Sequence, residues 1–295
     1  MFYSFGDFRI APSSKQVVVF QQHGSPFKTS GAATGYGTYT KEKIDNFTFS
    51  VVSASIYIPI MERSFMCKPE QIKVLGQARN DYFFSHNDGL KGLGIDRSKY
   101  KKLLLWMPTF RKTTSDARFH DGEALSEETG LPLISTQEQL KSIDKYLNEI
   151  GLLLCIKLHP YSELKDNNLN NILTLKNSDI LPKGVKLYEF VKEFDALLTD
   201  YSSISFDYII LDRPIGYTID DIDKYTRGFC FENPTDYMGG QRINSIEELK
   251  TYFKDVADGN DPYKEDRHRV CALTNTYIDG KSCQRLLDAC NLVIN

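Results

Sequence analysis

The sequence predicts an α/β fold with parallel sheets, arranged as two units. Short apolar runs alternate along the 295 residues with stretches in which apolar side chains recur at helical spacing. This alternation is typical of parallel strands joined by helical crossovers. A polar, glycine-containing stretch at residues 86–100 separates two such series and indicates a linker. We therefore expect an α/β unit over residues 1–95, a second over 96–280, and a C-terminal helix over 281–295.

The first series contains few strand-length runs. Buried strands are expected at residues 16–20, 47–52 and 73–75, with a helix over residues 55–66. A Rossmann-like half with three or four strands normally uses more chain than this. We therefore expect the N-terminal domain to be shortened at its start.

The second series is richer in strands and helices. Apolar runs of strand length occupy residues 102–107, 152–158, 196–199 and 215–217. Helices are expected at residues 136–150, 202–211 and 245–256, and residues 263–295 are expected to be mostly helical. Gly151 closes the first of these helices, and Ser245 with Glu248 forms a capping box that opens the third.

Composition excludes several classes of protein. With 41% hydrophobic and 25% charged residues the chain can bury a core, and a net charge of −3 argues against bulk nucleic-acid binding. The six cysteines form no C-x-x-C pair, which indicates a reducing compartment and no zinc site. The start lacks a signal-peptide pattern, and the most apolar window, residues 51–61, is short of the ~20 residues that span a bilayer. We expect a cytoplasmic protein.

A strand that runs directly into a serine-rich turn offers a site for a phosphate. Ser202 and Ser203 begin the predicted helix 202–211, where backbone N–H groups lack partners inside the helix. Ligands of open α/β sheets bind at the carboxyl ends of strands, where this turn lies. The alternative is that the serines, with Asp200, merely cap the helix. Asp207 lies on the same face as Ser203 and is expected to support it.

Two histidines also follow strands. His159 comes directly after the strand at residues 152–158, and could donate to a phosphate oxygen if that strand shares a sheet with the strand at 196–199. His23 stands before Gly24, which permits a close approach, and its ordinary pKa near 6.5 suits a general base. Each histidine considered alone is more commonly a structural turn residue.

A fourth segment lies at the end of the strand at residues 102–107. It places Pro108 and Thr109 at the strand end, with Arg111 able to reach an anion. A binding role and a structural role are about equally supported there.

These segments occur in a characteristic order. They are HGSPFK at residues 23–28, GQARND at 76–81, PTFR at 108–111, HP at 159–160, TDYSS to LDRP at 199–214, and YTRGF at 225–229. Together they resemble the CDP-glycerol glycerophosphotransferase family, which comprises teichoic-acid primases and polymerases and related capsule polymerases. The match extends over about residues 16–255, which is most of the chain.

The resemblance implies a GT-B-like architecture, in which two Rossmann-like domains enclose the active site in a cleft. It implies transfer of a polyol phosphate, glycerol phosphate first among the choices, from CDP-glycerol or CDP-ribitol to a hydroxyl of a cell-surface polymer or its lipid-linked precursor. CMP leaves, and neither a cofactor nor a metal ion is required. The enzyme would act in the cytoplasm, peripherally on the inner face of a bacterial cell membrane, without nucleic acid.

The resemblance also assigns roles to residues. His23 is the expected base, and His159, Ser202 and Ser203 are expected to hold the diphosphate. Residues expected to bind the CDP-polyol are Pro108, Thr109, Arg111, Thr199, Asp200, Ser202, Ser203, Asp207 and Arg227. Residues expected on the acceptor side are Gly24, Ser25 and Lys28.

The chain departs from the family pattern in places. Gln22 stands where an aromatic residue is frequent, Ser25 replaces a threonine, and Met238-Gly239-Gly240 replaces a P-G-P segment. Two alternatives remain open: a GT-B glycosyltransferase that uses a nucleotide sugar, and a truncated, inactive nucleotide-binding module.

Overall fold

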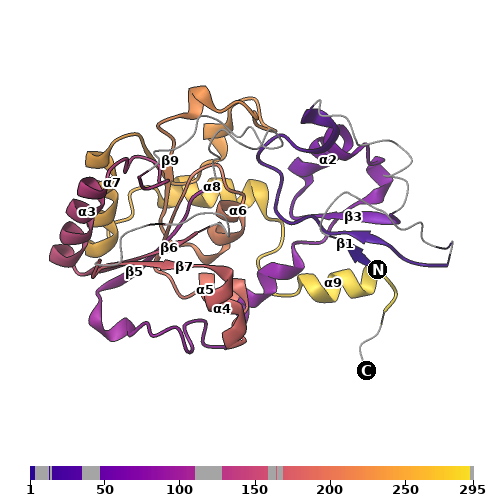
Figure 1. Cartoon of the computed structure of the whole chain (residues 1–295). Helices are drawn as coiled ribbons and strands as arrows, with labels where there is room; N and C mark the ends of the chain where they lie inside the picture. The colour runs from indigo at the N-terminus through magenta and orange to yellow at the C-terminus, as the bar shows by residue number, and fades with distance from the viewer. Residues whose placement is uncertain are drawn as a thin grey trace.

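The chain folds around two parallel β-sheets, as the sequence predicts (Figure 1). The computed structural model describes residues 1–3, 13, 15–34, 47–109, 128–158, 164 and 169–292. In this part of the chain one sheet is built from residues before 75 and the other from residues after 101. The division into domains at residues 95 and 280 stays a prediction.

The first sheet has the order β1-β2-β3-β4, and all of its strands are parallel. The strands are β1 (Phe2–Tyr3), β2 (Val19–Phe20), β3 (Phe49–Val52) and β4 (Ile72–Val74). The predicted strand at residues 16–20 is only two residues long, and β1 was not predicted. One face packs against η2 (Ser55–Tyr57) and α2 (Ile58–Phe65), and the other packs against α9 (Ser282–Ala289).

The second sheet has six parallel strands in the order β10-β9-β8-β5-β6-β7. They are β5 (Lys102–Met107), β6 (Leu152–Lys157), β7 (Ile172–Leu175), β8 (Ala196–Thr199), β9 (Ile215–Thr218) and β10 (Gln241–Ile243). Counted along the chain, this is the doubly wound order 3-2-1-4-5-6. The strand order therefore reverses between β5 and β8, which is where ligands bind in such sheets.

Helices cover both faces of the second sheet. Alternate residues of β5 show this division: Leu104 and Trp106 pack with α3 (Gln137–Ile150) and α7 (Ile246–Asp258), whereas Leu103 and Leu105 face the opposite cluster. That cluster includes α5 (Leu187–Val191), α6 (Ile204–Tyr208) and α8 (Lys264–Thr274). Because β5 is buried on both faces, its sequence is continuously apolar and its bounds were predictable.

Helix caps also agree with the sequence. The Thr136 hydroxyl accepts from the Gln139 N–H at 3.2 Å, and Gly151 ends α3 with φ +77°. Ser245 accepts from the Glu248 N–H at the start of α7. The predicted helix at residues 202–211 is instead α6 followed by η7 (Ile209–Leu211).

The remaining elements are short. They are η1 (Gly31–Thr34), η3 (Pro69–Gln71), η4 (Ala78–Phe84), η5 (Arg97–Lys99), α4 (Asn177–Ile180), η6 (Leu181–Lys183), η8 (Ile222–Lys224) and η9 (Pro234–Tyr237). The predicted linker at residues 86–100 is packed rather than loose, because Leu90, Leu93 and Ile95 contact the core of the second unit.

A buried arginine on α8 holds the end of η7. The Arg267 side chain is 1% exposed, and its Nη2 lies 2.7 Å from a carboxylate oxygen of Asp212 and of Asp261. His268 Nε2 lies 3.0 Å from Asp212. Partial burial raises the pKa of Asp212, but hydrogen bonds from His268 and Arg267 outweigh it and leave the pKa below its usual value. A depressed carboxyl pKa stabilises the fold above the unfolded value near 3.9, and this stabilisation is lost as pH falls through the folded value.

We therefore predict that Arg267→Met removes part of the acid sensitivity of folding. Urea unfolding at pH 6 and at pH 3 should show a smaller loss of unfolding free energy in the variant than in the wild type. Arg269→Met is the matched control, because Arg269 pairs with Asp266 on the exposed face of the same helix. Equal pH dependence in the wild type and the Arg267 variant would contradict the assignment.

Candidate functional site

The carboxyl ends of β5 and β8 are joined by side-chain hydrogen bonds at the point where the strand order reverses. The Thr199 hydroxyl donates to the Met107 carbonyl at 2.8 Å. The Asp200 carboxylate accepts from the Thr109 N–H at 2.9 Å and from the Thr109 hydroxyl at 2.5 Å. Both Thr199 and Asp200 are fully buried. These bonds fix the turn after β8 relative to the end of β5.

Pro108, Thr109, Thr199 and Asp200 lie at or beside this junction. They were expected to bind the CDP-polyol, but none is among the described residues that line the cavity beside them. The side-chain polar groups of Thr109, Thr199 and Asp200 form hydrogen bonds within the protein, as buried polar groups generally do. Direct binding by these residues stays a prediction, whereas their structural role is evident.

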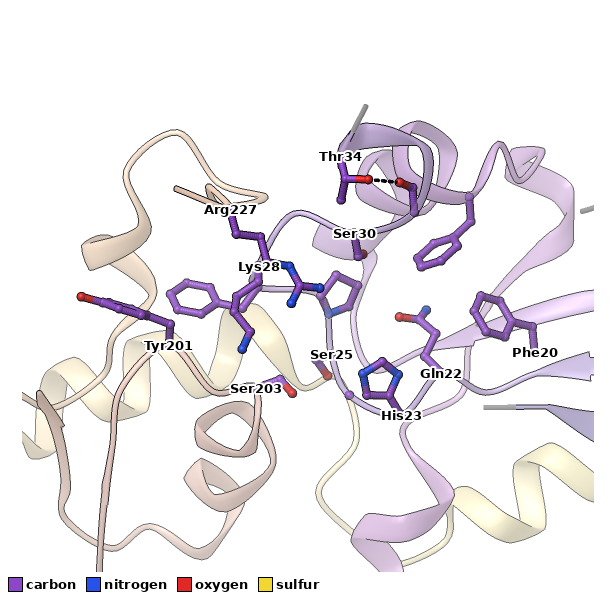
Figure 2. A pocket seen from close by; sticks show the side chains of 15 residues that line it. Phe20, Gln22, His23, Ser25, Lys28, Ser30, Thr34, Tyr201, Ser203 and Arg227 are labelled. Atoms are coloured by element: carbon purple, nitrogen blue, oxygen red, sulfur yellow. Dashed lines mark hydrogen bonds between the residues drawn. The ribbon is translucent and has the colours of Figure 1, made fainter. Parts of the chain in front are cut away.

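A cavity of about 190 Å³ lies where the two units meet (Figure 2). The first unit contributes the HGSPFK segment, and the second contributes Tyr201, Ser203 and Arg227. Figure 2 shows the side chains of His23, Lys28 and Ser203 around the same space. The structure thus brings together the predicted residues His23, Gly24, Ser25, Lys28, Ser203 and Arg227.

Gly24 is pressed against the serine turn. A Cβ atom at Gly24 would lie 2.2 Å from the Ser203 Oγ and 3.1 Å from its Cβ, so any side chain at this position would force Ser203 to move. Gln22, two residues before Gly24, is buried and has φ +56°, a conformation that is uncommon for a non-glycine residue. The chain therefore turns sharply between β2 and His23, and this turn brings His23 to the cavity.

Two cationic side chains stand on the cavity wall. The Lys28 Nζ lies 3.5 Å from the Thr109 Oγ1, and the Arg227 Nε donates to the Thr29 carbonyl at 2.9 Å. The segments that carry them run antiparallel, with Lys28 bridged to Phe229. Positive charge placed between two units favours an anionic ligand there.

An aromatic group supports the loop that carries Arg227. The Tyr201 ring lies 4.6 Å from that of Tyr225 and 5.3 Å from that of Phe229, measured between centroids. The Tyr201 hydroxyl donates to Asp221 at 2.8 Å. Asp221 therefore anchors the tyrosine of the TDYSS turn.

Asp207 does not support Ser203 as expected. Its carboxylate forms a bidentate ion pair with Arg79, at 3.0 Å to Nε and 3.2 Å to Nη2, and accepts from the Tyr188 hydroxyl at 2.7 Å. Burial raises the pKa of Tyr188 well above its usual value, and the charge of Asp207 raises it further. Although burial lowers the pKa of Arg79, Asp207 and Tyr188 raise it above normal. Asp207 is buried and paired and is not among the described residues that line the cavity, so direct binding of the CDP-polyol by Asp207 stays a prediction.

Sequence reasoning missed Arg79 and Tyr188. A signal for Arg79 was present, since an aspartate inside the apolar stretch 204–211 needs a buried partner and the GQARND segment supplies a cation. Nothing comparable marked Tyr188, which lies on α5 and meets Asp207 only through the packing of α5 against α6.

The two serines of the turn have different positions. Ser203 is the N-cap residue of α6 and lines the cavity. Ser202 is half-buried, is not among the described lining residues, and its carbonyl accepts from the Ser205 hydroxyl at 3.1 Å. The structure therefore favours Ser203 over Ser202 as the residue that meets a ligand.

Two predicted site residues, Arg111 and His159, lie outside the described residues. The strand before His159 can be placed: β6 and β8 both pair with β5, so they flank it in one sheet. The carboxyl ends of both strands therefore lie at the same edge.

Two searches of the described residues gave negative results. No group of three or more His, Cys, Asp or Glu side chains among them could hold a metal ion. None of their helices combines the length and apolar character needed to cross a bilayer. The expectation that no metal ion takes part stays a prediction.

Comparison with known proteins adds to this geometry. The model of the family described as CDP-Glycerol:Poly(glycerophosphate) glycerophosphotransferase matches residues 4–292. The chain belongs to this family. The predicted family is thereby confirmed over nearly the whole chain.

Family relatives include teichoic-acid enzymes. The chain is 29% identical over 253 residues to a teichoic acid ribitol-phosphate primase of Bacillus spizizenii, covering 82% of this chain and 59% of the relative. It is 27% identical over 250 residues to a teichoic acid glycerol-phosphate primase of Bacillus subtilis, covering 82% and 57%. The chain thus spans less than three fifths of the length of these relatives.

Solved structures establish the fold. The wall teichoic acid polymerase TagF superposes with a TM-score of 0.70 at 20% identity, covering 95% of this chain and 69% of TagF. A UDP-N-acetylglucosamine 2-epimerase of Listeria monocytogenes superposes with a TM-score of 0.54 at 14% identity, covering 94% and 67%. At such low identity the likeness concerns architecture alone, and it confirms the GT-B-like fold.

The contact of Gly24 with Ser203 leads to a stability prediction. Gly24→Ala should destabilise the protein by about 1–3 kcal/mol, because the added methyl group overpacks the junction. The loss should be smaller in a Ser203→Ala background, where the atom at 2.2 Å is absent. Urea unfolding of the wild type, both single variants and the double variant measures this coupling. Additive effects of the two substitutions would contradict the contact.

Proposed function

We propose that the chain transfers glycerol phosphate from CDP-glycerol to a hydroxyl of a cell-surface polymer or its lipid-linked precursor, releasing CMP. The observation that carries this proposal is the cavity where His23, Ser203, Lys28 and Arg227 converge from separate segments. The family match supports it, as do relatives named as teichoic acid primases and polymerases. A TagF structure obtained with CDPG adds support for the donor.

The donor diphosphate would lie between Ser203 and the two cations. The Ser203 hydroxyl can donate to a phosphate oxygen, and the Lys28 ammonium and the Arg227 guanidinium offset the negative charge. Phosphoryl transfer needs donors that are already oriented toward the transferring group. The bonds of Thr109 to Asp200 and of Arg227 to Thr29 provide this orientation.

His23 would act as the general base. In this step an acceptor hydroxyl oxygen forms a bond to the β-phosphorus as its proton passes to the imidazole. The bond from the β-phosphorus to the bridging oxygen breaks, and CMP leaves with that oxygen. An imidazole suits this step because its ordinary pKa lies near neutral pH. The family resemblance also assigns His159, which follows β6 in the sequence, to holding the diphosphate.

The acceptor would enter from the first unit. The cavity extends past His23 to Gln22 and Phe20, as Figure 2 shows, so a polyol end with a reactive hydroxyl would lie on this side. We propose that the enzyme works in the cytoplasm, peripherally on the inner face of a bacterial cell membrane, where a lipid-linked acceptor is presented. Ribitol phosphate is the other polyol that the relatives' names support.

We predict CMP release from CDP-glycerol in the presence of a membrane fraction or a polyol-phosphate acceptor. His23→Ala and Ser203→Ala should each lower the rate by about 10²–10³-fold, because each removes a group that acts on the transferring phosphate. CDP-ribitol and a UDP-sugar serve as competing donors. Release of UDP from the sugar nucleotide, without CMP release, would favour a glycosyltransferase instead.

A matched control variant shows whether loss of a hydroxyl far from the cavity segments also lowers the rate of CMP release. Thr251→Ala removes a hydroxyl from the exposed side of α7, far in sequence from the cavity segments, and should leave the rate unchanged. Failure of His23→Ala to lower the rate would contradict the role of this residue as the base.

A further inference from the structure

The GQARND segment at residues 76–81 takes no part in the proposed chemistry, yet it makes specific long-range contacts. Gly76 has φ +80°, and a Cβ there would lie 2.4 Å from the Ser282 Oγ. Asp81 accepts from the N–H groups of Ser282 at 2.9 Å and Cys283 at 2.7 Å. These two residues open α9, so one side of the segment fastens α9 to the first sheet.

Arg79 points to the other side of the segment and meets the second unit. Its guanidinium binds Asp207 on α6 through two nitrogens, and its Nη1 also donates to the Gln77 side chain at 3.1 Å and the Gln22 carbonyl at 3.5 Å. The Asp207 side chain is 2% exposed, and Tyr188 donates to it as well. One guanidinium therefore contacts both α6 and the backbone beside the HGSPFK segment.

The two groups that Arg79 holds, Asp207 and the Gln22 carbonyl, lie beside two residues of the cavity wall, Ser203 and His23. Asp207 lies four residues after Ser203, one helical turn along the same face of α6. Gln22 directly precedes His23 and has φ +56°. Arg79 itself is not among the described residues that line the cavity. It would therefore influence the geometry of a bound donor through these neighbours and not by direct contact.

We propose that Arg79 is a positioning residue that sets the separation between the His23 imidazole and the Ser203 hydroxyl. The planar guanidinium suits this role, because its fork fixes a carboxylate in two directions and leaves a further N–H for a backbone carbonyl. This inference rests on the proposed function, for which both groups act on one transferring phosphate.

A purely structural ion pair would behave differently from a positioning residue. Loss of a structural pair lowers stability but leaves the turnover of the folded molecules unchanged. Loss of positioning lowers kcat while the donor KM changes little, because the cavity groups that bind the donor are still present. A fall in kcat per folded molecule, with little change in the donor KM, therefore distinguishes a positioning role from a purely structural one.

The test compares Arg79→Lys with the wild type in CMP release from CDP-glycerol. Lysine keeps a positive charge beside Asp207, but a single ammonium cannot reproduce the fork. We expect kcat to fall about 10²-fold, as for a displacement near 1 Å at the reacting groups. The donor KM should stay within about twofold. Rates are expressed per folded molecule, with the folded fraction determined by circular dichroism.

Two further variants serve as controls. One tests whether any change in the GQARND segment lowers kcat, and the other tests the loss of Arg79 without leaving an unpaired buried charge. Asp81→Asn is the matched control, because it alters the same segment but loosens α9 and not α6. It should lower the melting temperature and leave kcat within about twofold. The double variant Arg79→Gln with Asp207→Asn removes both buried charges together, so it should fold, and its kcat should still be about 10²-fold low.

The outcomes separate this inference from the function on which it rests. A wild-type kcat in Arg79→Lys or in the double variant overturns the inference alone, as does an equal fall in kcat for Asp81→Asn. Absence of CMP release by the wild-type chain, with acceptor present, overturns the proposed function and this inference with it.

Discussion

The arrangement of the site depends on two contacts between the first unit and α6, the short helix after β8. In the first contact Gly24 packs against Ser203. In the second, one helical turn further along, Arg79 forms an ion pair with Asp207. Removing one partner of a buried ion pair costs about 3–5 kcal/mol, because it leaves an unpaired charge in the interior. Two parallel sheets can meet in many orientations, but these contacts select one.

The second sheet fixes the position of the turn that leads into α6. Parallel strands place their carboxyl ends at one edge, and the order reverses between β5 and β8. Two hydrogen bonds between Asp200 and Thr109 join the segments that follow these two strands. The turn that carries Ser203 therefore starts from a rigid point, and it ends on the helix that the first unit holds. The proposed phosphate site would thus be oriented before a ligand arrives, as transfer of a charged group requires.

The sequence predicts those strands and helices whose bounds are set by residues close together in the chain. The bounds of β5 and β8 follow from apolar runs buried on both faces, and the start of α3 follows from the capping pair of Thr136 and Gln139. The convergence of His23 with Ser203 was expected from the family resemblance, which rests on the order of the segments. The sequence showed that Asp207 needs a buried cation, but it did not show that Arg79 fills this need, because Arg79 is 128 residues away and only the fold brings it near. The edge strands β7 and β10 were missed because each has exposed or half-exposed positions that break the apolar run.

The central claim is that groups from both units meet on one donor diphosphate. A crystal structure of the chain with CDP-glycerol bound tests it most directly. The account predicts the diphosphate in the cavity of Figure 2, with a phosphate oxygen about 2.7–3.0 Å from the Ser203 hydroxyl and the His23 imidazole on the opposite side of the β-phosphorus. A donor bound elsewhere on the second sheet, with its diphosphate out of reach of both Ser203 and His23, would contradict the account.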